Sequence, residues 1–123
     1  MAGGALMRCG ASGRVFMVTE TETRSLRKRG ADLSDLTHDD VQGVVRRRIE
    51  RSEARKGKKF SELGKHAQRH LKEDADLTGY PAVECCLTGR NYWITSINGG
   101  TILVRDHRND SNNLLFDRCK VIA

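Results

Sequence analysis

The hydrophobic pattern changes its period once along this chain, and that change constrains the fold more than any other feature. Between about residues 37 and 74, apolar residues recur every three to four positions, the spacing of amphipathic helices. From residue 82 onward apolar and polar residues alternate, as they do on strands with one buried face. A helical region followed by consecutive strands predicts an α+β fold with a mainly antiparallel sheet.

The helical region divides into two predicted helices around Gly57. The first begins after Thr37, a favourable N-cap residue, and Leu36 and Val41 have the spacing of a hydrophobic staple. Its core-facing stripe consists of Val41, Val44, Val45 and Ile49. The second covers residues 59–74, with Phe60, Leu63, Ala67 and Leu71 facing inward. We expect the two helices to form a hairpin that packs on one face of the sheet.

The predicted strands surround this hairpin in the order β-α-α-β-β-β-β. They cover residues 14–19, 82–88, 92–97, 101–105 and 114–122. Asn98-Gly99 is a strong signal for a hairpin between the third and fourth of them. The polar segments 20–35 and 108–113 are interpreted as connections.

The length and composition favour one globular domain. The chain has 123 residues, of which 37% are hydrophobic and 31% charged, enough to build a core without disulfides or metals. Residues 1–13 are Gly-rich, and we expect them to form a flexible N-terminal segment. Residues 14–123 are therefore predicted to form a single α+β domain.

Positive charge is concentrated in one stretch of the chain. Residues 46–72 contain eleven Lys or Arg against three Glu, a net charge of +8, whereas the whole chain carries +6. The remainder therefore sums to −2. Such a segment attracts polyanions or acidic protein surfaces, and spaced cations displace the counterions of phosphates.

We therefore expect a small basic protein that binds nucleic acid through a Lys/Arg-rich helical hairpin. The binding residues predicted are Arg46, Arg47, Arg51, Arg55, Lys56, Lys58, Lys59, Lys65 and Arg69. A different class of function stays open on the same charges: a non-catalytic protein-binding inhibitor or modulator, of mobile-element or phage type, that docks on an acidic or nucleic-acid-binding host complex.

A third interpretation is a metal-independent endoribonuclease of toxin type. Such an enzyme needs a base, cations for the phosphate and an acid for the leaving group. His107 or Tyr92, with Arg105 and Arg118, supply the residue types, and Arg90 and Arg108 add cations near predicted turns. No catalytic motif accompanies them, so the sequence favours a binding protein over an enzyme.

Metals, cofactors and membranes are not expected. His66 and His70 lie on one ridge of a predicted helix with Glu62 and Asp74, but the His-Glu-x-x-His signature is missing. The four cysteines have no Cys-x-x-Cys spacing, and we expect Cys85 and Cys119 to act as small hydrophobic residues on strands. With no apolar run of about 18 residues and no recognisable leader, the expected location is the cytoplasm.

Overall fold

The computed structural model describes the backbone of residues 5–8 and 15–123, and side chains from residue 15 onward. The chain divides into two compact units, Met1–Arg51 (the N-terminal unit) and Ser52–Ala123 (the C-terminal unit), which are described separately. The predicted flexible segment lies outside the described residues except at positions 5–8. The single domain expected over residues 14–123 stays a prediction.

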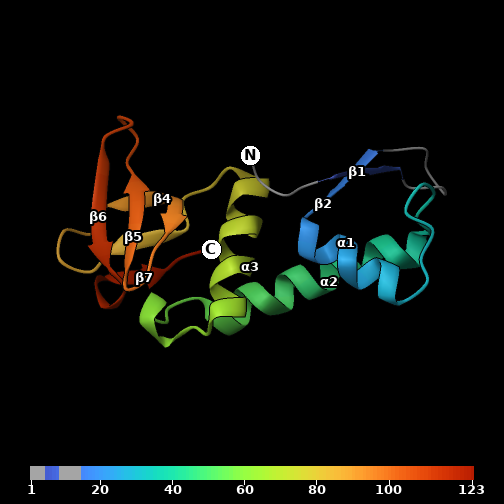
Figure 1. Cartoon of the computed structure of the whole chain (residues 1–123), viewed down its shortest axis with the longest axis horizontal. Coiled ribbons are helices and arrows are strands. Elements are labelled where there is room, and N and C mark those ends of the chain that lie inside the picture. Colours follow the sequence, from blue (N-terminus) through green and yellow to red (C-terminus); the bar gives the residue numbers. More distant parts are fainter. Residues whose placement is uncertain (1–4, 9–14) are drawn as a thin grey trace. The chain divides into compact units, whose positions relative to one another are not determined.

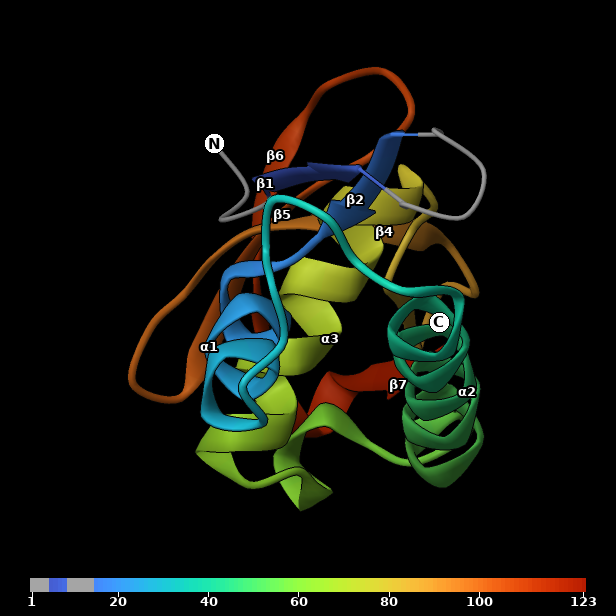
Figure 2. The same cartoon turned by 90° about the vertical axis from the view of Figure 1, so that its right-hand side faces the viewer.

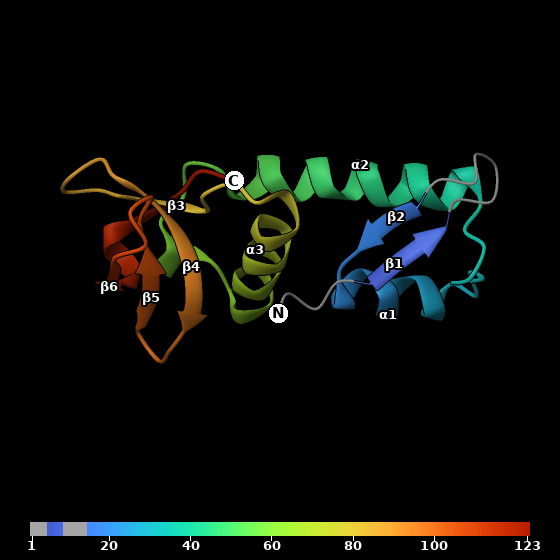
Figure 3. The same ribbon diagram turned by 90° about the horizontal axis from the view of Figure 1, so that it is seen from above.

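The N-terminal unit combines a strand hairpin with helices. Strands β1 (Ala5–Arg8) and β2 (Val15–Val18) pair antiparallel, and helices α1 (Glu20–Lys28) and α2 (His38–Arg55) follow. Figure 3 shows the hairpin beside α1 and the first part of α2, and Figure 2 shows the same elements from the end. The core of this unit consists of four buried residues, Val18, Leu26, Leu36 and Val44.

Both helices of this unit begin with reciprocal capping hydrogen bonds. The Glu22 backbone N–H donates to Thr19 Oγ1, and the Thr19 N–H donates to Glu22 Oε1. The same exchange joins Thr37 and Asp40 at the start of α2. These bonds satisfy N–H groups that have no partner within the helix. The predicted helix start after Thr37 is therefore confirmed.

Helix α1 occupies a segment that was predicted to be mainly a connection. Its one fully buried aliphatic side chain is Leu26, so the sequence shows no repeating apolar stripe there. The signal was instead the Thr-x-x-Glu capping box at Thr19 and Glu22. The prediction of two helices was wrong because it relied on periodicity where capping was the stronger sign.

The expected two-helix hairpin on one sheet face is also not formed. In α2, Val44 is buried in the core of the N-terminal unit, whereas Val45 and Ile49 of the predicted stripe are 36% and 54% exposed. Leu71 and Ala75 of helix α3 (Lys65–Thr78) belong to the other core. The α+β class is confirmed, but α2 and α3 contribute these residues to different cores.

The C-terminal unit is a five-stranded antiparallel sheet with α3 along one side (Figure 1). The strand order is β6-β5-β4-β3-β7. Its elements, besides α3, are the 3-10 helices η1 (Phe60–Glu62) and η2 (Phe116–Arg118) and the strands β3 (Val83–Cys85), β4 (Asn91–Ile97), β5 (Thr101–Arg105), β6 (Ser111–Leu115) and β7 (Cys119–Val121). The hairpin predicted at Asn98-Gly99 is confirmed as the connection of β4 to β5.

This sheet is curled. Its edge strands β6 and β7 would lie about 19 Å apart in a flat sheet of five strands. Cys119 follows Leu115 by only four positions, which span at most about 14 Å. The chain can reach the opposite edge only if the sheet curves toward closure. The single strand predicted at residues 114–122 is therefore two strands, separated by η2.

A short segment before η1 extends the β7 edge. The Gly57 N–H donates to the Val121 carbonyl, and the Val121 N–H donates to the Lys58 carbonyl. Lys59 then forms a bridge with Lys120. These contacts pair backbone groups that an edge strand would otherwise leave open. None of the described helices is long and apolar enough to span a lipid bilayer.

Candidate nucleic-acid interface

The nine predicted binding residues are divided between the two units. Arg46, Arg47 and Arg51 belong to the N-terminal unit, and the remaining six belong to the C-terminal unit. In each unit, the cations available to a ligand are those that have no carboxylate partner.

Arg55 is occupied inside the C-terminal unit. Its side chain is 7% exposed, and Nη1 donates to Asp74 Oδ2 at 2.9 Å. Its Nε also donates to the Ala123 carbonyl at 3.0 Å. A guanidinium held this way has no exposed face for a phosphate. The structure removes Arg55 from the exposed cations on which the sequence prediction relied.

Arg51 is engaged inside the N-terminal unit. Its Nη2 lies 3.1 Å from Glu22 Oε2, and the neighbouring Arg48 binds both oxygens of that carboxylate at 2.7 Å. Glu22 is only 5% exposed. These contacts stabilise the helix pair, and the Glu22 carboxylate offsets one of the two positive charges of Arg48 and Arg51.

Of the three predicted binding residues in this unit, Arg46 and Arg47 are less engaged than Arg51. Burial, and then the charges of Arg29, Arg46 and Arg51, lower the pKa of Arg47. Arg46 lies 3.8 Å from Glu50, a pair in which both side chains are largely exposed. Arg29, Arg46 and Arg51 therefore place positive charge near Arg47, and a bound anion would offset it.

Five of the predicted cations are exposed on the C-terminal unit. They are Lys56, Lys58, Lys59, Lys65 and Arg69. Within residues 15–123 none of them forms an ion pair.

One of these cations, Lys59, begins a row of residues that crosses the sheet. Lys59 is bridged to Lys120, Lys120 is the cross-strand partner of Glu84, and Glu84 is the cross-strand partner of Asn91. Because partners on adjacent strands share a face, this row leads across the sheet to Asn91.

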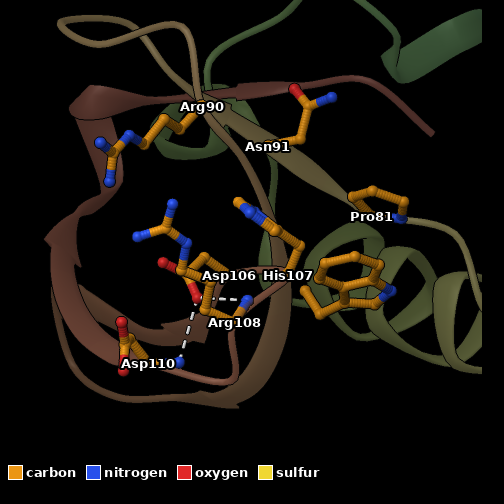
Figure 4. Close-up of a pocket in the computed structure, with 8 residues that line it drawn as sticks. Pro81, Arg90, Asn91, Asp106, His107, Arg108 and Asp110 are labelled. Carbon is orange, nitrogen blue, oxygen red and sulfur yellow. Dashed lines mark hydrogen bonds between the residues drawn. The ribbon is translucent and has the colours of Figure 1, made fainter.

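A pocket of about 410 Å³ begins where that row ends (Figure 4). Trp93 and Pro81 supply its apolar wall. Its polar lining comes from Arg90 and Asn91, at the start of β4, and from Asp106, His107, Arg108 and Asp110, in the loop between β5 and β6. Figure 4 shows the side chains of Arg90, His107 and Arg108 reaching toward the same space from two separate segments.

Trp93 is held in place on two sides. Its indole Nε1–H donates to the carbonyl of Gly79, the left-handed C-cap residue of α3, at 2.9 Å. The Arg105 guanidinium carbon lies over the indole, 5.4 Å from the ring centroid. Arg105 itself does not line the pocket. An aromatic wall fixed in this way loses little entropy when a planar ligand contacts it.

Asp106 organises the loop that carries His107 and Arg108. It is buried, and its Oδ1 accepts the backbone N–H groups of Arg108 at 2.9 Å and Asp110 at 3.0 Å. Burial raises the pKa of Asp106, but those two hydrogen bonds and the charges of His107 and Arg90 lower it overall. Asp106 is therefore ionised, and its carboxylate fixes the backbone of the loop. Asn109 of the same loop has a left-handed φ of 68°, a conformation that asparagine tolerates in turns.

The structure assembles only part of the ribonuclease constellation expected from the sequence. Arg90, His107 and Arg108 come together at the pocket. Tyr92 is 5% exposed and belongs to the core, because alternation along β4 turns it to the face opposite Trp93. Arg118 lies in η2 and does not line the pocket. The sequence reasoning missed Trp93, which the alternation beside a buried Tyr92 could have indicated, and also Pro81, Asn91, Asp106 and Asp110.

The histidine ridge and the cysteines have other contacts. The rings of His66 and His70 lie edge to face with centroids 4.6 Å apart, while Asp74 of the same ridge contacts Arg55. Among the described side chains, no group of three or more His, Cys, Asp or Glu is arranged to hold a metal ion. Cys85 and Cys119 are buried partners on β3 and β7, as expected for small hydrophobic residues. Burial, with Cys85, Cys86 and Asp117 nearby, raises the pKa of Cys119 to about 12.

Comparisons with known proteins identify no relative: no family model, no curated protein and no solved structure matches the chain.

Proposed function

We propose that this protein binds nucleic acid through the outer face of the C-terminal sheet. We define the outer face as the side of the sheet that carries Lys59, Lys120, Glu84, Asn91, Trp93 and Arg105, together with the pocket beside Asn91 and Trp93. The observation that carries the proposal is the pocket itself, in which an aromatic wall lies beside two arginines and a histidine, with Asp106 and Asp110 in the same lining.

The two exposed arginines of the pocket support a phosphate ligand. Arg90 and Arg108 are exposed, and neither forms an ion pair with a residue of the described chain. Of the two carboxylates in the lining, Asp106 is occupied by backbone N–H donors, and Asp110 is exposed. Planar guanidinium groups match phosphate oxygens in bidentate geometry. Lys120 and Lys59 extend the positive charge away from the pocket, and Glu84 is the acid in that row.

The proposal relocates the interface expected from the sequence. The exposed lysines of residues 56–59 still contribute, because Lys59 is joined to the outer face through Lys120. Arg51 and Arg55 are instead committed to carboxylates. A docking protein with an acidic surface would use the same cations, but it would not require an aromatic wall beside them.

Removing the two pocket arginines tests the proposal. We expect Arg90→Gln with Arg108→Gln to raise the Kd for a fluorescein-labelled 12-nucleotide single strand about tenfold at low salt. The slope of log affinity against log salt should fall by about 1.4, since two phosphate contacts are lost. Fluorescence anisotropy over a salt series measures both quantities. The substituted side chains are exposed, so the fold should be retained.

Lys65→Gln with Arg69→Gln is the matched control. It removes the same charge from exposed positions of α3, within the same unit, but away from the pocket lining. We expect a change in Kd of no more than about twofold, from the altered net charge alone. Equal losses in the two double variants would contradict a specific role for the outer face. A larger loss in the α3 variant would return the interface to the helix.

A further inference from the structure

We propose that the pocket takes one unpaired nucleobase, stacked on Trp93, with the adjoining phosphate bound by Arg90 and Arg108. The protein would then prefer single strands to duplexes. This inference rests on the proposed function and specifies its substrate class. It depends on three features of the pocket: its size, its aromatic wall and the arrangement of its polar groups.

The size fits one planar group and excludes a duplex. About 410 Å³ lies within the range of small-ligand pockets and is ample for a single base. Bases inside a duplex are stacked on their neighbours, and reaching a side pocket requires unstacking and unpairing them. An unpaired strand presents its bases without that cost. Binding of a base in the pocket therefore favours single strands over duplexes.

The aromatic wall supplies affinity with little dependence on sequence. Trp93 is the one tryptophan of the chain, and its orientation is set by the Gly79 carbonyl and by Arg105. Every base has a π-face, so stacking on a fixed indole tolerates all four. Pro81 adds apolar contact next to it.

The polar groups are placed to hold the strand beside the base. Arg90 precedes β4 and Arg108 lies in the loop between β5 and β6, so two separate segments approach the same space (Figure 4). Asn91 offers both a donor and an acceptor to a base edge. His107 adds a group that donates a hydrogen bond to a phosphate or a base. Beyond the pocket, Lys120 and Lys59 mark a path for the following phosphates.

Fluorescence of the single tryptophan tests this directly in the full chain. Three 12-nucleotide probes are titrated: a single strand, the duplex of the same sequence, and an abasic strand with the same number of phosphates. We expect the single strand to quench Trp93 and to bind at least fivefold more tightly than either other probe, since stacking contributes about 1–3 kcal/mol per base. Anisotropy of labelled probes is recorded in parallel.

Two variants separate stacking from structure. Trp93→Phe keeps an aromatic ring but loses the hydrogen bond to Gly79, and Trp93→Leu loses both. We expect the Phe variant to bind the single strand within about threefold of the wild type and the Leu variant to lose at least about fivefold. Neither substitution should change the affinity for the abasic strand, which measures the phosphate contacts alone.

The outcomes distinguish this inference from the proposed function. Binding of all three probes with equal affinity and no quenching would overturn the base pocket and leave nucleic-acid binding standing. Equal losses in the Phe and Leu variants would also overturn it, because the indole would then act only through its hydrogen bond. Absence of binding by anisotropy for every probe at low salt would overturn both proposals.

Discussion

Replacing Asp74 with asparagine is expected to lower the free energy of unfolding by about 3–5 kcal/mol, the usual cost of stranding one partner of a buried ion pair. Asp74 and Arg55 are 10% and 7% exposed, and their charged atoms are 2.9 Å apart. Without the carboxylate, a buried guanidinium keeps only its other contacts, including the Ala123 carbonyl. Urea denaturation followed by Trp93 fluorescence measures the loss, because the single tryptophan lies in the same unit.

An exposed pair on the same helix provides the control. Lys72 and Asp76 lie 2.7 Å apart with both side chains nearly 30% exposed. Asp76→Asn should cost no more than about 0.5 kcal/mol, as for most solvated pairs. Replacing the whole buried pair, as Arg55→Met with Asp74→Leu, should recover most of the stability. If Asp74→Asn proves no more harmful than Asp76→Asn, Arg55 is not the structural residue described above.

Replacing Glu22 with glutamine should destabilise the N-terminal unit by about 2–3 kcal/mol. The Glu22 carboxylate is 5% exposed and accepts two hydrogen bonds from Arg48 at 2.7 Å and one from Arg51 at 3.1 Å. An amide cannot match both arginines. The cost stays below that of Asp74 because Arg48 and Arg51 are 24% and 22% exposed and keep some hydration. Hydrogen exchange of the α1 amides measures it.

Glu20→Gln is the matched control for this prediction. Glu20 also pairs with an arginine of its unit, Arg24, at 2.7 Å, but both side chains are about 60% exposed. Its loss should change protection of α1 by no more than about 0.5 kcal/mol. Similar effects at positions 20 and 22 would contradict the stabilising role given to the buried carboxylate.

The same carboxylate should make this unit sensitive to acid. Burial raises the pKa of Glu22, but hydrogen bonds from Arg48, Thr19 and Arg51 and the Arg48 charge lower it overall from the ordinary value of 4.5. A depressed folded-state pKa gives stability that is present above pH 4.5 and is lost as the pH falls through the folded value. The wild type should therefore lose more stability than Glu22→Gln on acidification below pH 4.5. Identical pH profiles would contradict this.

Short sequence signals predicted the turns and helix ends, which depend on neighbouring residues alone. Asn98-Gly99 predicted the β4–β5 hairpin because its residues favour the tight turn that joins Ile97 to its cross-strand partner Ile102. Thr37 marks the start of α2 because its side chain caps that helix. The break at Phe116–Arg118 was not predictable in this way, since it contains no Gly or Pro to mark a turn. The strand breaks there because the chain has to pass from β6 to β7, which lie at opposite edges of the sheet.

The candidate site was harder to predict because the charges in a sequence do not show which residues form ion pairs with one another. Arg48 and Glu22 are 26 residues apart, and Arg55 and Asp74 are 19 apart. No sequence window shows that these cations are neutralised by the fold. The pocket likewise joins Arg90 to Arg108 across two strands and a loop. The residue types were visible in the sequence, but their convergence depends on the strand order.

The central claim is that nucleic acid binds the outer face of the C-terminal sheet. Its most direct test is a ¹H–¹⁵N correlation spectrum of the full chain titrated with an unlabelled 12-nucleotide single strand. We predict that the indole N–H signal of Trp93 shifts most, together with the amides of Arg90, Arg108 and Lys120. Shifts confined to the amides of Arg46 and Arg47 or to those of α3, with the Trp93 signal unmoved at saturation, would contradict the claim.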